Sequence, residues 1–153
     1  MNILLLNGPN LNLLGEREPH IYGTTTLAEL EQMVQKRARE LGADLRAFQS
    51  NHEGALIDEM HQSRRWAGGV IFNPGAFTHS SYALRDAIVA TRLRVVEVHL
   101  SDISKREPWR RISLLEEVCA HRVLGKGVAG YLEALEWLVK RASDLGPQAS
   151  GKS

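Results

Sequence analysis

Five strand-length runs, most of them apolar, alternate with helical patterns along this sequence, and this order restricts the fold more than any other feature. Apolar residues recur at steps of three and four from Leu27 to Leu41, and Gly42 then ends the pattern as a helix terminator. The predicted strands are Asn2–Asn7, Asp44–Gln49, Gly69–Asn73, Arg94–Leu100 and Arg122–Gly125. The predicted helices are Leu27–Leu41, Glu53–Trp66, Ser80–Thr91 and Tyr131–Ser143.

Strands that alternate with helices imply right-handed crossovers and an open parallel sheet. We therefore predict a flavodoxin-like α/β fold, a three-layer sandwich whose five-stranded parallel sheet has the order 2-1-3-4-5. The length of 153 residues fits one domain, which we place at residues 1–145. The remaining residues, 146–153, are rich in Gly, Pro and Ser and are predicted to form a disordered tail.

Composition excludes several classes of partner. The chain has 19 Lys and Arg against 18 Asp and Glu, so no basic field favours nucleic acid. No apolar run reaches membrane-spanning length, so no membrane partner is predicted. The single cysteine, Cys119, allows no internal disulfide and fits a reducing compartment. We expect a cytoplasmic protein.

The predicted sheet indicates where a ligand would bind. In open parallel sheets, ligands bind outside the carboxyl ends of the strands. Three of these ends carry Asn or His, in the segments 7–10, 73–79 and 99–101. The six histidines lack the spacing of a zinc protease, and Gly125-Lys126-Gly127 is better explained as a turn than as a phosphate loop. The sequence pattern therefore predicts neither a metal site nor a phosphate-binding loop.

Two polar segments stand out near these strand ends. About eighteen residues separate Asn7 from the helix that follows it, whereas such connectors usually have two to six. This segment carries Arg17 and Tyr22. A tyrosine phenol titrates near pH 10, and a guanidinium about 4 Å away can supply the roughly 4 kcal/mol needed to make it a base at pH 7. The alternative is a packed aromatic ring beside an exposed arginine.

The second polar segment follows the fourth predicted strand and carries Arg106 and Arg110, four residues apart. Pro108 is expected to start a short helix there. A charged loop of this kind is often only solvated surface, but its position at the ligand edge of the sheet favours a binding role.

Five segments resemble, in order, those of the type II 3-dehydroquinate dehydratases, also called type II dehydroquinases. They are NGPNLNLLGEREPHIYG, QSNHEGALIDEMHQ, NPGAFTHSSYALRDAI, VEVHLSDISKREPWR and GKGVAGYLEAL, and they extend to about residue 143. The resemblance implies a flavodoxin-like fold, no cofactor, a lid formed by the loop after Asn10, and a dodecamer assembled from trimers. It also implies the trans-dehydration of 3-dehydroquinate to 3-dehydroshikimate through an enolate, a step of the shikimate pathway.

The resemblance assigns four catalytic roles. Tyr22 resembles the base that removes a proton from C2, and Arg17 its activator. Asn10 resembles the group that, with a water, stabilises the enolate oxygen, and His99 the acid that protonates the departing C1 hydroxyl. These roles fit the chemistry, because an enolate needs stabilisation and hydroxide leaves poorly unless it is protonated.

The remaining implied site residues bind substrate. Asn73 and the backbone amides of Leu100 and Ser101 resemble the partners of the substrate carboxylate. The ring hydroxyls would be held by His79, Arg110 and Asp86, the last reaching into a neighbouring subunit's site. Arg106 would belong to the lid. The sequence departs from the common family pattern at Phe77, Asp102, Pro108 and Trp109.

Two other functions remain open at the level of sequence. One is a flavodoxin-like module that binds a small anion or nucleotide without chemistry. The other is a lyase that dehydrates through a Schiff base on lysine, although none of the lysines is placed in a pocket by the sequence pattern. They are Lys36, Lys105, Lys126, Lys140 and Lys152.

Overall fold

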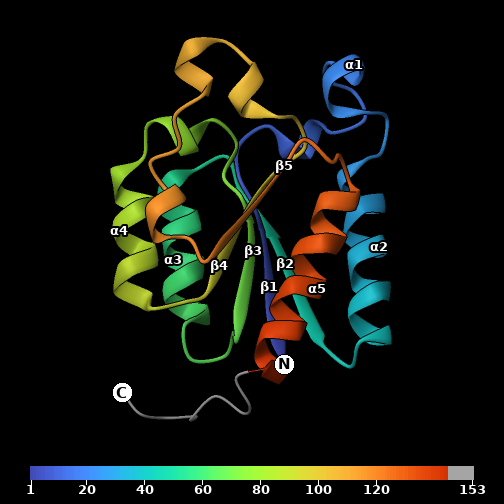
Figure 1. Cartoon of the computed structure of the whole chain (residues 1–153), viewed down its shortest axis with the longest axis vertical. Coiled ribbons are helices and arrows are strands. Elements are labelled where there is room, and N and C mark those ends of the chain that lie inside the picture. Colours follow the sequence, from blue (N-terminus) through green and yellow to red (C-terminus); the bar gives the residue numbers. More distant parts are fainter. Residues whose placement is uncertain (145–153) are drawn as a thin grey trace.

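The five strands form one parallel sheet in the order β2-β1-β3-β4-β5, which confirms the predicted topology. The computed structural model describes residues 1–144, so the predicted tail lies outside the described residues. Figure 1 shows the sheet in the middle of the molecule with helices on either side. The strands are β1 (Asn2–Asn7), β2 (Asp44–Gln49), β3 (Gly69–Asn73), β4 (Val95–His99) and β5 (His121–Leu124).

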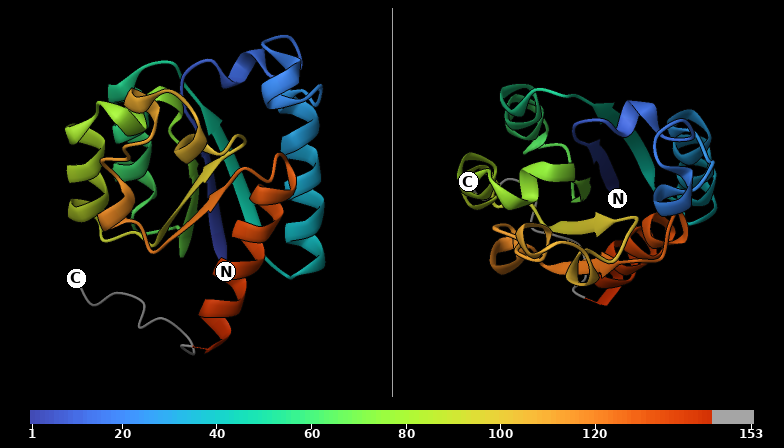
Figure 2. Two further views of the ribbon diagram at one scale, coloured as in Figure 1. Left: turned by 45° about the horizontal axis from the view of Figure 1, so that its top comes forward. Right: turned by 90° about the horizontal axis from the view of Figure 1, so that it is seen from above.

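Four helices cover the two faces of the sheet and form the outer layers of the sandwich, as the view from above in Figure 2 shows. One face carries α2 (Leu27–Glu40) and α5 (Ala129–Asp144), and the other carries α3 (Glu53–Ser63) and α4 (Tyr82–Thr91). Alternate residues of β1 serve the two faces, because successive side chains of a strand point to opposite sides. Ile3 and Leu5 pack in the cluster of α2 and α5, whereas Leu4 and Leu6 pack with α3 and α4.

The boundaries differ from the prediction mainly at the ends of elements. The first three strands have the predicted bounds, while β4 is shorter and β5 begins at His121. Helix α3 ends at Ser63 rather than at Trp66, because residues 64–66 form a turn that the Trp66 amide closes by donating to the Ser63 carbonyl oxygen. The N-terminus of α2 carries a capping box in which Thr26 and Glu29 exchange hydrogen bonds. Among residues 1–144, no helix is both long and apolar enough to cross a membrane.

Short helices occupy the two polar segments. The segment after β1 contains η1 (Leu11–Leu13) and α1 (Pro19–Tyr22), and the segment after β4 contains η3 (Ile103–Lys105) and η4 (Pro108–Arg110). The short helix expected at Pro108 is thus present. In Figure 1, α1 and the segment after β4 project above the carboxyl ends of the strands, so they frame that edge of the sheet.

The loops after β1 and β3 interlock at the same edge. The amide of Gly8 donates to the carbonyl oxygen of Asn73 at 2.8 Å. A Cβ on Gly8 would lie 2.6 Å from the carbonyl oxygen of Pro74, so only glycine allows this approach. Gly75 has a φ of +57° and packs against Pro9. The Asn-Gly-Pro-Asn and Asn-Pro-Gly sequences therefore fix the relative position of two strand ends.

Candidate active site

A cavity of about 100 Å³ opens at the carboxyl ends of the strands, where the sequence predicts ligand binding. All predicted site residues except Asp86 line it, and they come from three separate segments of the chain, at and after the ends of β1, β3 and β4. They are Asn10, Arg17, Tyr22, Asn73, His79, His99, Leu100, Ser101, Arg106 and Arg110. The fold thus gathers polar and cationic groups that are up to 100 positions apart in sequence.

Two guanidinium groups contact Tyr22, which lies at the end of α1. Arg106 Nη1 donates a hydrogen bond to the Tyr22 hydroxyl at 2.7 Å. Arg17 lies over the ring instead, with its guanidinium carbon 4.2 Å from the ring centroid. The sequence pairs Tyr22 with Arg17 alone, whereas the structure adds Arg106 as the direct partner of the oxygen. The Tyr22 oxygen thus accepts a charge-assisted hydrogen bond.

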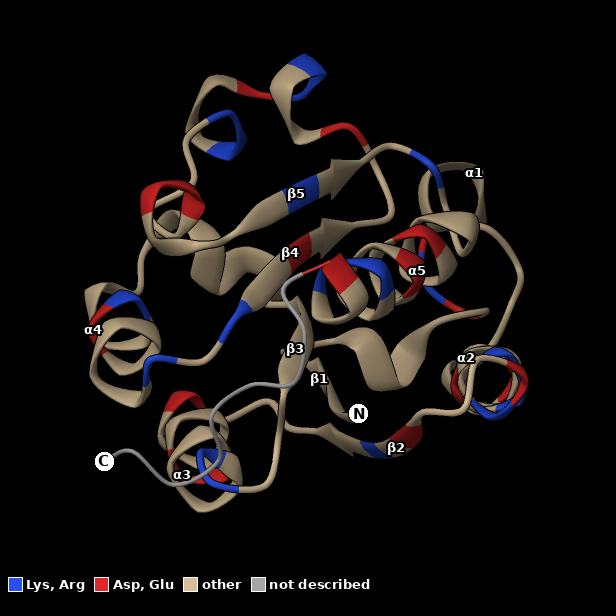
Figure 3. Ribbon diagram, turned by 60° about the horizontal axis from the view of Figure 1, so that its bottom comes forward, with Lys and Arg blue, Asp and Glu red and all other residues tan. Residues whose placement is uncertain are grey.

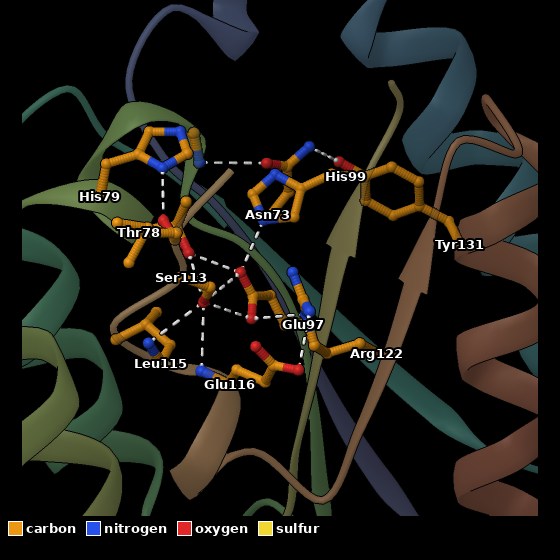
Figure 4. Close-up of polar contacts among 12 residues, drawn as sticks. Asn73, Thr78, His79, Glu97, His99, Ser113, Leu115, Glu116, Arg122 and Tyr131 are labelled. Atoms are coloured by element: carbon orange, nitrogen blue, oxygen red, sulfur yellow. Dashed lines mark hydrogen bonds and ion pairs between the residues drawn. The ribbon is translucent and has the colours of Figure 1, made fainter. Parts of the chain in front are cut away.

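His99 is hydrogen-bonded to a carboxylate that the sequence prediction missed. Glu97 has no accessible surface, and its Oε2 lies 2.6 Å from His99 Nε2 (Figure 4). Burial alone would raise the pKa of this carboxyl, but the hydrogen bonds from His99, Thr78 and Ser113 bring its pKa below the ordinary value. An ionised Glu97 accepts only, so His99 Nε2 carries a hydrogen and its Nδ1 is left for the cavity.

Further contacts hold Glu97 in place. Thr78 donates to Oε2 at 2.5 Å, and Ser113 donates to Oε1 at 2.9 Å. Arg122 on β5 lies 3.4 Å from Oε1. In Figure 3, β4 carries an acidic segment in red and β5 a basic segment in blue. The sequence does contain a signal for Glu97: it interrupts an apolar strand two residues before His99, so both side chains lie on one face.

His79 is held in one tautomer. Its Nδ1 lies 2.7 Å from the carbonyl oxygen of Ile112, which can only accept, so Nδ1 carries the hydrogen. Burial lowers the pKa of His79 below its ordinary value, although the hydrogen bond to Ile112 opposes this shift. At neutral pH the ring is uncharged, and Nε2 remains an acceptor suited to a ligand hydroxyl.

Comparison with known proteins identifies the family. The sequence profile described as "Dehydroquinase class II" matches residues 1–139. The chain belongs to this family. It is 56% identical over 135 residues to the 3-dehydroquinate dehydratase of Anoxybacillus flavithermus, covering 88% of this chain and 91% of that protein. It is 53% identical to the Catabolic 3-dehydroquinase 1 of Aspergillus fumigatus, covering 88% and 90%.

A solved structure agrees with this assignment. The type II dehydroquinase from Butyrivibrio crossotus superimposes with a TM-score of 0.89 at 41% identity, and the match covers 90% of this chain and 97% of that one. The flavodoxin-like fold predicted from the strand order is therefore the fold of a class II dehydroquinase.

Two departures from the common dehydroquinase pattern, Pro108 and Trp109, lie next to residues that line this cavity. The Trp109 ring contacts the His79 ring edge-on, with centroids 5.4 Å apart. The Arg110 guanidinium lies over Trp109 at 4.1 Å, and Arg110 Nε donates to Glu107 at 2.6 Å. Trp109 thus links two of the residues predicted to bind ring hydroxyls, and Pro108 starts the short helix that carries it.

Asp86 is the one predicted site residue of the dehydroquinase that lies outside the cavity. It is exposed on α4, and this single chain brings it into contact with none of the other site residues. Within residues 1–144, no cluster of three or more His, Cys, Asp or Glu side chains has the geometry of a metal site. Burial raises the pKa of the Cys119 thiol, which keeps it a packed, protonated side chain.

Proposed function

We propose that the chain is a hydro-lyase that converts 3-dehydroquinate to 3-dehydroshikimate by trans elimination of water, a step of the shikimate pathway. One observation carries the proposal: the cavity contains two proton-transfer groups, each held by charged partners. Tyr22 has Arg106 on its oxygen and Arg17 on its ring, and His99 has Glu97 on its Nε2. The family and its named relatives support the same reaction.

The first half of the proposed reaction forms an enolate. The Tyr22 phenolate takes a proton from C2, the C2–H bonding electrons move toward the ketone, and negative charge collects on the C3 oxygen. Asn10, with a water, stabilises that oxygen. The backbone of Asn10 is held in a left-handed conformation, with a φ of 69°, and its amide donates to Asn51 at 3.0 Å. This fixed position suits a group that must be in place before charge develops.

The second half expels water. In its imidazolium form, His99 gives the Nδ1 proton to the C1 hydroxyl as the C1–O bond breaks. The enolate electrons form the C1–C2 double bond and restore the ketone, and the products are water and the enone. Glu97 orients the His99 ring and balances the charge of an imidazolium. Because the carboxylate is buried and accepts several hydrogen bonds, it holds this geometry without taking the proton itself.

The other predicted residues are assigned to binding. Asn73 and the amides of Leu100 and Ser101 receive the substrate carboxylate, and His79 and Arg110 receive ring hydroxyls. Arg106 belongs to the machinery that closes the lid, which is the loop after Asn10.

Asp86 is proposed to complete the site of a neighbouring subunit within a trimer, four of which form a dodecamer. Its place on an exposed helix face beside Tyr82 and Val89, which are 68% and 58% exposed, supports a subunit contact there. The cytoplasmic location also stays a prediction from the sequence.

The alternatives fit the cavity less well. A binding module without chemistry leaves the paired proton-transfer groups unexplained. A Schiff-base lyase needs a lysine in the cavity, and no lysine among residues 1–144 lines it.

The test is a direct assay of the purified protein with 3-dehydroquinate, following the ultraviolet absorbance of the enone product. We expect turnover that persists after treatment with borohydride in the presence of substrate. Absence of the enone would contradict the proposed function, and inactivation by borohydride would favour the lysine mechanism.

A further inference from the structure

A chain of hydrogen bonds lies buried behind Asn73. The Tyr131 hydroxyl donates to Asn7 Oδ1 at 2.7 Å, and Asn73 Nδ2 donates to the Tyr131 oxygen at 2.9 Å. Asn7 and Tyr131 have no accessible surface, and Asn73 is 3% exposed. Figure 4 shows Tyr131 reaching from α5 toward Asn73.

The strand register explains how three distant residues meet. Asn7 and Asn73 are the last residues of β1 and β3 and pair directly across the sheet. Their side chains lie on the face of the sheet that α5 covers, because alternate residues of a strand share a face. Ile71, two residues before Asn73, packs in the same cluster as Tyr131. Gly130 lets the first turn of α5 approach closely, because a Cβ there would lie 3.2 Å from a Val123 methyl group.

The Gly75 amide, at one end of this series of hydrogen bonds, fixes the direction of each of them. The Gly75 amide can only donate, and it lies 3.0 Å from Asn73 Oδ1, so the amide nitrogen of Asn73 faces Tyr131. The Tyr131 oxygen accepts a hydrogen bond from that nitrogen, and the Tyr131 hydroxyl donates a hydrogen bond to Asn7 Oδ1. One hydrogen of Asn73 Nδ2 is then left over, and Asn73 lines the cavity.

Core stability does not account for this arrangement. Phenylalanine at position 131 would fill the same volume without a hydroxyl to satisfy. An apolar residue at position 7 would remove Nδ2, a buried donor that has no partner in the described part of the protein. Buried polar groups are costly unless they are paired. Burial also raises the pKa of the Tyr131 phenol, so the phenol stays neutral and can donate its hydrogen bond to Asn7.

We propose that Tyr131 is a positioning residue for substrate binding: it holds the Asn73 amide so that a hydrogen-bond donor, not the carbonyl oxygen, faces the substrate carboxylate. The inference rests on the proposed role of Asn73 as a partner of that carboxylate. Without the hydroxyl, the Asn73 amide loses the contact that holds its nitrogen side. The Gly75 amide alone would then hold the side chain by its oxygen, and the Nδ2 donor would be less well aimed at the anion.

The variant Tyr131→Phe removes one oxygen and preserves the ring. We expect the KM for 3-dehydroquinate to rise about tenfold while kcat changes by less than about threefold, because a carboxylate contact is present in both ground and transition states. In an Asn73→Ala background, the same substitution should raise KM no further, since its effect passes through Asn73.

Ser63→Ala is the matched control. It also removes a fully buried hydroxyl, one that contacts Arg46 and Glu59 far from the cavity. It should lower the melting temperature without changing KM. A wild-type KM in Tyr131→Phe, or an equal rise in KM with and without Asn73, would overturn the proposal.

A second variant keeps the proposal testable if Tyr131→Phe does not fold. Asn7→Ala removes the acceptor of the Tyr131 hydrogen and should raise KM in the same direction; an unchanged KM there would contradict the inference. Turnover by the wild-type protein is measured first, so failure of the proposed function is distinguished from failure of this inference.

Discussion

At the scale of single residues, the site places two groups of the same chemistry in different surroundings. Tyr22 and Tyr131 are both tyrosines near the site. Tyr22 lies against two guanidinium groups, whereas Tyr131 is fully buried between two amides, where burial raises its pKa. A cationic donor therefore contacts one oxygen, whereas only neutral amides contact the other. This contrast separates a candidate base from a fixed hydrogen-bonding group.

Replacing Tyr22 with Phe should lower kcat by about 10²-fold to 10⁴-fold, the usual contribution of a positioned proton-transfer group. Substrate affinity should change much less, since other residues hold the carboxylate and the hydroxyls. Single-turnover kinetics with 3-dehydroquinate deuterated at C2 measure the proton-abstraction step directly. If Tyr22 only packs the lid, the rate of this step will stay at the wild-type value and the melting temperature alone will change.

Glu97→Gln should change how stability depends on pH. The pKa of Glu97 is lower in the folded protein than its ordinary value of 4.5, so the unfolded chain binds the proton first. The stabilisation from the carboxylate is complete above pH 4.5 and is lost as the pH falls below it toward the folded-state pKa. Urea unfolding between pH 3 and 7 should therefore show a shallower acid loss of stability in the variant than in the wild type.

A suitable comparison for Glu97→Gln is Glu116→Gln. Glu116 contacts the same Arg122, at 3.0 Å, but its side chain is 57% exposed, and such surface pairs contribute little. The free energy of unfolding of Glu116→Gln should therefore depend on pH as that of the wild type does. If the free energy of unfolding falls equally steeply with decreasing pH in the wild type and in Glu97→Gln, protonation of the buried carboxylate does not contribute to the acid loss of stability.

At the scale of elements, the sequence predicted most of the fold because its signals are local. Periodicity and terminators indicated four helices and five strands, with three strands at the observed bounds. The contact between Arg106 and Tyr22 joins residues 84 positions apart, and no local pattern reports such a distance. The roles of the site residues came from the resemblance to the family, and they stay predictions until they are tested by substitution.

Gly8→Ala tests the interlocked loops after β1 and β3. A Cβ at Gly8 would lie 2.6 Å from the Pro74 carbonyl oxygen, and backbone must move to accommodate it. We expect the free energy of unfolding to fall by about 1–3 kcal/mol, as for overpacking elsewhere, and dehydratase activity to fall with it.

Gly54→Ala is the control for Gly8→Ala. Gly54 lies in α3, and a Cβ added there would meet no atom within 4 Å. Alanine at this helical position should add about 0.5–1 kcal/mol to the free energy of unfolding, because it restricts the unfolded chain more than glycine does. Urea denaturation measures both variants, and equal stability of the two would contradict the close approach at Gly8.

At the scale of the whole molecule, the single chain gathers every predicted site residue but one. Asp86 projects from α4 on the same face as Tyr82 and Val89, an exposed face that a second subunit would cover. We propose that contacts between identical chains place Asp86 in a neighbour's site. The oligomer then becomes part of the binding site, and activity should depend on assembly.

Mixing two defective chains tests this sharing. Asp86→Ala keeps Tyr22, and Tyr22→Phe keeps Asp86, so each variant alone has incomplete sites throughout. If Asp86 acts in a neighbouring site, random exchange within a cyclic trimer gives about a quarter of the sites both intact groups, and activity should rise toward about a quarter of wild type. If Asp86 acts only within its own chain, no mixed site is complete and the activity will not rise.

The reciprocal mixture uses wild type and a chain carrying both substitutions, in equal amounts. A shared site leaves about a quarter of the sites intact, because a wild-type subunit must receive Asp86 from another wild-type subunit, whereas an unshared site leaves about half. Native mass spectrometry of a tagged chain establishes that subunits have exchanged. With exchange established, no recovery in the first mixture and half activity in the second would together exclude the shared site, because both outcomes require each chain to supply its own Asp86.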